Sequence, residues 1–253
     1  MFGFESALVL SAVMGTLLLA GFVKGISGMG MQVVAMGVLS VVMPPAQAAA
    51  ILVVPSTVTN LWQLFTGPAF GALVRRLWAM MVAICVGTWL GFGALAGSNA
   101  KLAAFILGAV LVLYALLGLV KVRFRVPPEK EWWLSPVIGF VTGLLTGATG
   151  VFAIPAVPYL NALGLGKDEL VQSLGLSFTI STLALSLALF IQGAFGMQVA
   201  GASLLALLPA MLGMLAGEWM RVRVSEQGFR QLFLVGLLLL GAYTVIKNLP
   251  GHP

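Results

Sequence analysis

The sequence has little charge. Only 8% of its 253 residues are charged and 60% are hydrophobic, whereas soluble domains carry about 25% charged residues. This composition excludes an ordinary soluble fold. The period-two alternation of polar and apolar residues that builds a membrane β-barrel is also missing, so the apolar segments are interpreted as helices.

Residues that support common enzyme chemistry are scarce as well. The sequence has one histidine, His252 near the C-terminus, one aspartate, Asp168 in an expected loop, and one cysteine, Cys85 within an apolar run. A Ser/His dyad, a pair of intramembrane aspartates, a disulfide or a His- or Cys-rich metal site cannot be assembled from these residues. We therefore expect a protein that is not an enzyme and that uses no metal or other cofactor.

Long apolar runs are what the sequence has in abundance. A helix needs about 20 apolar residues to cross the hydrocarbon core of a bilayer, which predicts an all-α polytopic membrane protein with the lipid bilayer as a partner. The formal net charge of +6 comes from basic residues in short connections, where membrane topology explains them, so nucleic-acid binding is not expected. The clearest apolar runs cover 5–23, 77–96, 102–120 and 231–246.

One glycine-rich motif occurs twice. The segment GFVKGISGMG at 21–30 resembles GFVTGLLTGATG at 139–150, and a Thr-x-Thr at 57–59 corresponds to a Thr-x-Ser at 179–181. An internal duplication accounts for both similarities. The predicted organisation is a first transmembrane repeat over 1–120, a cytoplasmic linker over 121–133 and a second, inverted repeat over 134–253.

Each repeat is predicted to contain a glycine-broken helical hairpin and three longer helices. A hairpin arm of 13 residues is about 20 Å long at 1.5 Å per residue, less than the hydrocarbon core of about 30 Å, so such arms are expected to enter the membrane and return. The expected arms are 5–23 and 31–43 in the first repeat and 134–146 and 151–163 in the second. The expected spans are 47–66, 74–96 and 102–120, then 170–192, 199–220 and 231–248.

The number of crossings predicts the orientation. A hairpin crosses twice or not at all, so three further spans give each half an odd number of crossings and place the second half upside down. Cytoplasmic loops hold most Lys and Arg; with the N-terminus outside, Lys101 and Lys247 fall outside and ten basic residues fall inside. Four simple spans per half would divide the basic residues almost evenly. The ten are Arg75, Arg76, Lys121, Arg123, Arg125, Lys130, Lys167, Arg221, Arg223 and Arg230.

The two glycine-rich tips are the candidate site. Transporters with inverted repeats bind substrates near the midplane, where broken helices meet. A helix that starts at such a break presents unpaired N–H groups and a partial positive charge, which predicts an anion site. The candidate residues are Lys24, Gly25, Ser27, Gly28, Gly30 and Gln32 at the first tip, and Thr146, Gly147, Thr149 and Gly150 at the second.

Polar residues of the next helix in each half are expected to complete the cavity wall, namely Thr57 and Asn60 in the first half and Ser177 and Ser181 in the second. Each feature also has a structural interpretation. Lys24 can snorkel to the interface, the glycines can permit close packing of helices, and the polar side chains can bond between helices. Close packing is the expected role of the spaced pairs Gly87/Gly91 and Gly213/Gly217, which have no break.

The two breaks, GFVKGISGMG and GFVTGLLTGATG, are each followed by a helix rich in Ser and Thr and then by a GxxxG helix. Over essentially the whole chain this pattern resembles the TauE/SafE family of sulfite exporters, which are membrane permeases. The resemblance implies export of sulfite, sulfoacetate or related organosulfonates across a bacterial inner membrane, whereas the residues alone imply only a small anionic substrate. Pro55 stands where the second half has Ser177, so the two walls of the cavity are expected to differ.

The expected mechanism is alternating access. An anion channel and a permease for another small organic acid remain alternatives, and the sequence leaves the exact substrate, the coupling ion, the direction and the oligomeric state open. No proton relay is evident, so the membrane potential is a candidate driving force. It is worth about 2.3 kcal/mol per 100 mV for a monovalent anion.

Overall fold

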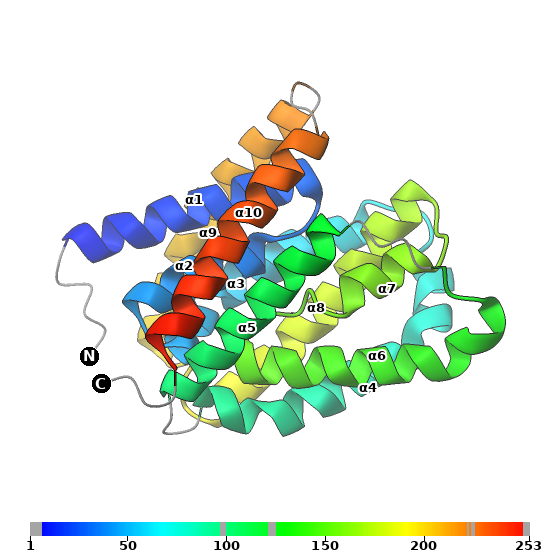
Figure 1. The fold of residues 1–253 in the computed structure, drawn as a ribbon, viewed down its shortest axis with the longest axis horizontal. Helices are drawn as coiled ribbons and strands as arrows, with labels where there is room; N and C mark the ends of the chain where they lie inside the picture. The colour runs from blue at the N-terminus through cyan, green and yellow to red at the C-terminus, as the bar shows by residue number, and fades with distance from the viewer. Residues whose placement is uncertain (1–6, 97–99, 121–124, 222, 224–225, 250–253) are drawn as a thin grey trace.

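A computed structural model describes residues 7–96, 100–120, 125–221, 223 and 226–249. This part of the chain forms ten α-helices and no strand (Figure 1). The first four residues of the expected linker, with Lys121 and Arg123, and also His252, lie outside it. The helices are α1 (Ala7–Ser27), α2 (Met31–Val42), α3 (Pro45–Phe65), α4 (Phe70–Ala96), α5 (Ala100–Leu119), α6 (Pro128–Thr149), α7 (Ala156–Ala162), α8 (Lys167–Ile191), α9 (Met197–Arg221) and α10 (Glu226–Lys247).

The fold class predicted from composition is confirmed. Among the described residues, six helices are long and apolar enough to cross a membrane, namely α1, α3, α4, α5, α8 and α9. Large apolar side chains lie exposed along them, as at Trp62, Leu90 and Leu208, where lipid is the solvent they require. The chain is a multi-pass helical membrane protein.

The short arms differ between the halves. The first half has the predicted short arm as α2, but the arm expected at 151–163 is an irregular segment over 151–155 followed by the seven-residue α7. Pro155 precedes α7 and Pro158 lies in its first turn, where a missing N–H costs no helical hydrogen bond. The prediction that a helix starts directly at both tips is therefore wrong for the second tip. The helix α6 also begins at Pro128, within the segment expected to be linker.

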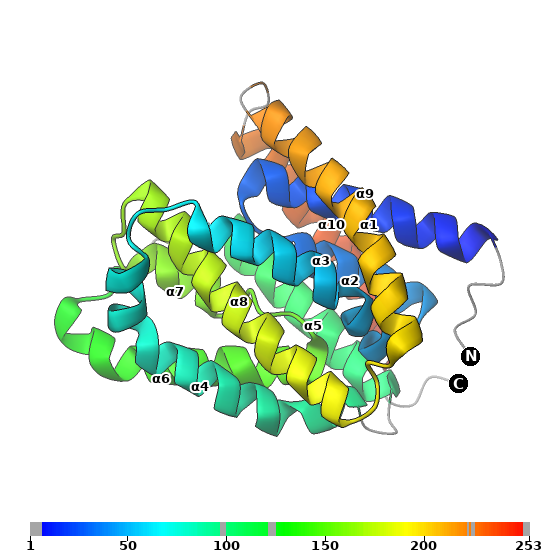
Figure 2. The same cartoon turned by 180° about the vertical axis from the view of Figure 1, so that it is seen from behind.

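Helices from opposite halves pack through glycine. The helix α1 lies along α9, and α4 lies along α6 (Figures 1 and 2). A Cβ atom built at Gly21 would lie 2.0 Å from the carbonyl oxygen of Ala210, and one at Gly91 would lie 2.2 Å from that of Leu144. Small residues let helix backbones approach this closely. The close packing predicted for Gly87/Gly91 and Gly213/Gly217 is confirmed, because each of the four meets facing backbone in this way.

Corresponding helices of the two halves cross each other in antiparallel sense. In the α3–α8 pair, Asn60 bonds to Thr182 while Leu64 approaches Gly175. In the α5–α10 pair, Gly108 approaches Val245 while Gly118 approaches Leu234. This pairing supports an inverted duplication with halves at 1–120 and 134–253. The inversion and its boundaries stay predictions.

Cysteine labelling tests the orientation. Arg76 and Glu131 form a two-pronged ion pair, with Nε–Oε1 at 2.7 Å and Nη2–Oε2 at 2.8 Å, which joins the beginnings of α4 and α6. In a Cys85→Ser background, we therefore expect an impermeant thiol reagent to label Arg75→Cys and Arg125→Cys from the same side of the membrane. Lys101→Cys, beyond the far end of α4, should be labelled from the other side. Labelling at 75 and 125 from opposite sides would contradict the inverted arrangement.

Candidate functional site

The first break separates α1 from α2 at three residues. Gly28 and Gly30 have φ of 73° and 93°, in the left-handed region that costs other L-residues roughly 1–2 kcal/mol. The Ser27 hydroxyl donates to the carbonyl oxygen of Met29 at 2.6 Å and so closes the turn. The chain then enters α2 at Met31, and the first N–H groups of this helix have no acceptor within the helix.

The second break ends α6 without starting a helix. Gly150 has φ of 74° and caps α6 through its N–H, which donates to the Thr146 carbonyl at 2.8 Å. The Thr149 hydroxyl accepts a hydrogen bond from the Val151 N–H at 3.2 Å. Residues 151–155 then run on irregularly.

A glutamine joins the two breaks. Gln32, in the first turn of α2, donates from Nε2 to the carbonyl oxygen of Gly150 at 2.9 Å. Its Oε1 accepts a hydrogen bond from the Ser56 hydroxyl of α3 at 2.7 Å, and all these groups are buried or nearly so. The two glycine-rich tips, 118 residues apart in sequence, therefore meet inside the protein.

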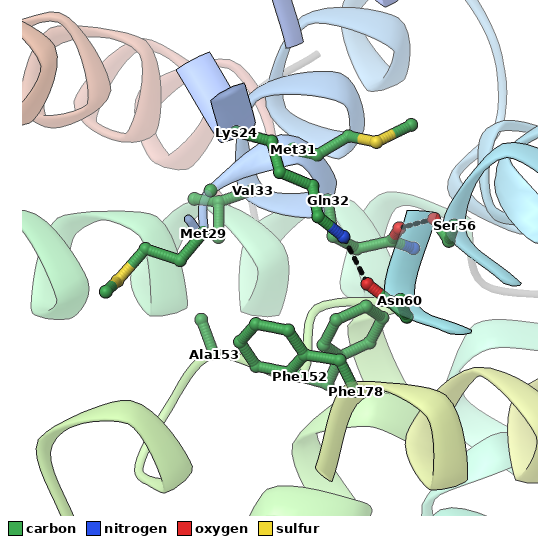
Figure 3. A pocket seen from close by; sticks show the side chains of 11 residues that line it. Lys24, Met29, Met31, Gln32, Val33, Ser56, Asn60, Phe152, Ala153 and Phe178 are labelled. Carbon is green, nitrogen blue, oxygen red and sulfur yellow. Dashed lines mark hydrogen bonds between the residues drawn. The ribbon is translucent and has the colours of Figure 1, made fainter. Parts of the chain in front are cut away.

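Lys24 projects into the protein beside this junction. Its side chain is only 5% exposed, and Nζ donates to Thr59 Oγ1 at 3.1 Å. It also donates to Asn60 Oδ1, as Figure 3 shows. Asn60 in turn donates from Nδ2 to Thr182 Oγ1 of α8 at 3.1 Å. The alternative that Lys24 snorkels to the membrane surface is wrong, because both of its acceptors are buried on α3.

The polar environment of Lys24 is neutral. In the described part of the chain, a salt bridge joins Arg76 to Glu131, and no salt bridge joins Lys24 to a carboxylate. A buried ion without a counter-charge is costly, by several kcal/mol even after relaxation. The first turn of α2, which lines the same pocket, adds the partial positive charge of a helix N-terminus. These features fit the anion site predicted from the sequence, which stays a prediction.

The rest of the pocket is apolar and tight. Phe152 of the second break and Phe178 of α8 lie side by side with ring centroids 5.0 Å apart and face Lys24 across the pocket (Figure 3), and Met29 also lines the pocket. The free space is about that of a single water molecule. A substrate must therefore displace side chains or helices in order to enter.

Four of the predicted site residues meet in this pocket, namely Lys24, Gly30, Gln32 and Asn60. Two more contribute carbonyl groups at its edge. Gly150 O accepts from Gln32 Nε2, and Gly28 O accepts from Gln63 Nε2 at 3.0 Å.

The other predicted residues lie outside the pocket lining. Gly25 and Gly147 are helix contacts, because a Cβ atom would lie 2.1 Å from Met214 O and 2.3 Å from Thr88 O respectively. Three hydroxyls donate to the carbonyl oxygen four residues earlier in their own helix, those of Thr57, Thr146 and Thr149. The Ser27 hydroxyl has two carbonyl oxygens within reach of its one hydrogen, those of Met29 and Val23.

Ser177 and Ser181 are a separate case. Both hydroxyls are buried on α8 and have no hydrogen-bond partner among the described residues. Neither lines the pocket. Their predicted contact with substrate therefore stays a prediction.

Sequence reasoning missed Ser56, Phe152, Phe178 and Thr182. Thr182 could have been found, since it directly follows Ser181, the residue that the repeat matches to Thr59, just as Asn60 follows Thr59. Phe152 and Phe178 carried no signal, because an aromatic residue in an apolar segment is most often core or lipid contact.

Apolar spans and helix breaks that meet inside the protein are features of membrane transporters, and here the buried Lys24 lies beside the breaks. The sequence model of the family described as Sulfite exporter TauE/SafE matches residues 13–244. The chain therefore belongs to the TauE/SafE family, which is a family of membrane transporters. No curated protein and no solved structure matches the chain.

Proposed function

We propose that this protein exports small sulfur-containing monoanions, such as hydrogensulfite or organosulfonates that carry no second charged group, across the bacterial inner membrane by alternating access. The observation that carries the proposal is the buried basic side chain of Lys24, which has neutral hydrogen-bond partners and lies beside the two helix breaks. The sulfur chemistry comes from membership of the family.

The charge of the pocket supports a single negative charge on the bound group. Lys24 is the one charged side chain that lines it in the described part of the chain. One cation neutralises one anionic head group, whereas a doubly charged anion would leave a net charge in a desolvated site. The partial charge at the start of α2 adds to Lys24 but does not equal a second cation.

The apolar side of the pocket favours a substrate that carries its charge at one end only. Phe152 and Phe178 face Lys24 and offer no group that could replace the hydration shell of an anion. A sulfonate has three oxygens at one end and a carbon substituent at the other. It can therefore place its oxygens near Lys24 and its carbon against the two rings.

Alternating access is supported by the closed pocket. A site with room for about one water molecule is not a continuous pore, and it must open toward one side or the other to exchange substrate. Single-channel currents in a planar bilayer would instead favour the channel alternative.

A thermal-shift screen of the purified protein tests the binding site. A ligand at 100 times its Kd stabilises the folded state by about 2.7 kcal/mol, which corresponds to roughly 5–10 °C for a protein of this size. We expect such a shift with methanesulfonate and sulfite and little with sulfate. A shift confined to sulfate or to carboxylates would contradict the proposed substrate class.

The matched variant for this screen is Asn60→Asp. It keeps the size of the side chain but gives Lys24 a carboxylate partner in place of the amide oxygen. The carboxylate competes with the substrate for the single cation, so we expect the ligand-induced shift to disappear while the protein stays folded. An unchanged shift would place the anion site elsewhere.

A further inference from the structure

The hydrogen bonds of Lys24 bear on how transport is coupled. A lysine ammonium has three N–H donors, and a neutral amine has two. In the structure Nζ donates to two protein acceptors, Thr59 Oγ1 and Asn60 Oδ1. Among the described residues, the protein therefore satisfies both donors of the neutral amine, whereas the ammonium keeps one N–H without an acceptor.

Each of the two acceptor residues also donates a hydrogen bond of its own. Thr59 Oγ1 donates its own proton to the Pro55 carbonyl at 2.7 Å, and Asn60 donates to Thr182, so both turn an oxygen lone pair toward Lys24. Neither carries a charge. The acceptors of the protein thus match a neutral Lys24, and an anion in the pocket would supply both a third acceptor and the counter-charge of the ammonium.

No carboxylate from a neighbouring helix compensates Lys24 in the described part of the chain. The helices α2, α3 and α8 present neutral groups to the pocket. On α9, which packs against α1, Glu218 is exposed and forms no recorded ion pair. On α5, Tyr114 donates its hydroxyl hydrogen to Met29 Sδ at 3.7 Å, and α10 approaches through Phe233. The side chains of Glu226 and Arg230 at the start of α10 lie outside the described residues.

We propose that Lys24 is the proton carrier of this transporter and that it binds one proton together with each anion. This inference rests on the proposed function. On one side of the membrane the amine lone pair takes up a proton as the sulfonate oxygens accept its third N–H. On the other side the anion leaves, the ammonium returns the proton to water, and the neutral amine is left with its two protein acceptors. No other bond is made or broken.

The proposal makes transport electroneutral. The loaded site holds one positive and one negative charge, and the empty site holds none, so neither state moves net charge across the membrane. The gradient of the anion then drives export in place of the membrane potential, the driving force considered from sequence, and an outside-acid proton gradient opposes export. Thr59 and Asn60 are positioning residues in this scheme.

Proteoliposomes loaded with an internal pH dye test the proposal. Methanesulfonate is the probe because it stays a monoanion throughout the neutral range, so any proton that accompanies it is carried by the protein. We expect its influx to acidify the lumen by one proton per anion and to be unchanged by a potassium-diffusion potential. Influx that follows the potential and moves no proton would overturn the proton carrier and leave the proposed function intact. Absence of influx in these vesicles would overturn the proposed function itself.

Two variants sharpen the result. Lys24→Arg keeps a cation but cannot release its proton, so any influx it supports should move no proton and should follow the potential. Lys101→Arg changes an exposed lysine in α5 and should keep the ratio of one proton per anion. Influx through Lys24→Arg with that same ratio would overturn the proposal.

A binding measurement needs no transport. At mildly alkaline pH in detergent, addition of methanesulfonate should draw one proton from weakly buffered solution per wild-type protein and none for Lys24→Met. Anion binding without proton uptake by the wild type would contradict the proposal even if every variant failed to transport.

Discussion

Replacing Lys24 with methionine is expected to reduce methanesulfonate transport in proteoliposomes by at least about 30-fold. Loss of one partner of a buried, hydrogen-bonded charge pair typically costs about 2–5 kcal/mol, and each 1.4 kcal/mol is a factor of ten. Methionine matches the length and flexibility of lysine and suits a pocket that already contains Met29 and Met31. The variant therefore removes the cation and little else.

Stability separates this effect from a structural one. In the empty protein Lys24 has no ionic partner among the described residues, so its replacement by an apolar side chain should leave the Tm unchanged or raise it. The control Lys101→Met, on the exposed start of α5, should keep wild-type transport. A Lys24→Met protein that transports normally, or that loses transport only because it unfolds, would contradict a binding role for Lys24.

Gly91→Ala is expected to destabilise the protein strongly. The added Cβ atom would lie 2.2 Å from the carbonyl oxygen of Leu144 in α6, and that oxygen belongs to backbone that cannot swing aside. Overpacking of this kind costs typically 1–3 kcal/mol, which corresponds to roughly 2–12 °C in Tm for a chain of this length. The measurement is thermal unfolding of the purified protein, followed by tryptophan fluorescence.

Gly93→Ala is the matched control, two residues further along the same helix. Nothing lies within 4 Å of a Cβ atom at Gly93, and alanine is the better helix former by about 1 kcal/mol. This variant should therefore unfold at the wild-type temperature or slightly above it. Equal losses of stability in the two variants would mean that the α4–α6 contact does not hold the fold together.

The fold class could be predicted because the bilayer imposes a strong constraint. Spans of about 20 apolar residues have few other uses, and the helices α1, α3, α4, α5, α8 and α9 follow from that pattern. The spaced glycines at 87/91 and 213/217 were also correctly predicted to permit close packing, whereas Gly25 and Gly147, which the motif assigned to the breaks, pack in the same way. Their partners were not readable, since sequence spacing does not say which helix a glycine faces.

The site could be predicted only in part. Lys24 and Asn60 were identified from polarity alone, but their hydrogen bond joins residues on different helices and depends on how α1 and α3 are rotated. That rotation comes from the packing of α1 on α9, which no local pattern encodes. The irregular course of 151–155 was missed because two prolines, Pro155 and Pro158, were given less weight than the repeat. The resemblance between the halves predicted a regular arm there.

The first helix of each predicted half, α1 or α6, packs against a helix of the other half. This packing affects which parts of the protein can move. Because the backbone of α1 packs directly against that of α9, and the backbone of α4 against that of α6, we expect each pair to move as one body although its members come from different predicted halves of the chain. Lys24 belongs to the α1–α9 pair, and Phe152 lies just after α6 of the α4–α6 pair. An opening that admits substrate between Lys24 and Phe152 would therefore separate these two helix pairs, and not the two predicted halves that the segment 121–133 connects. If the two predicted halves were made as separate chains, each would expose the glycine-lined helix face that normally packs against the other half.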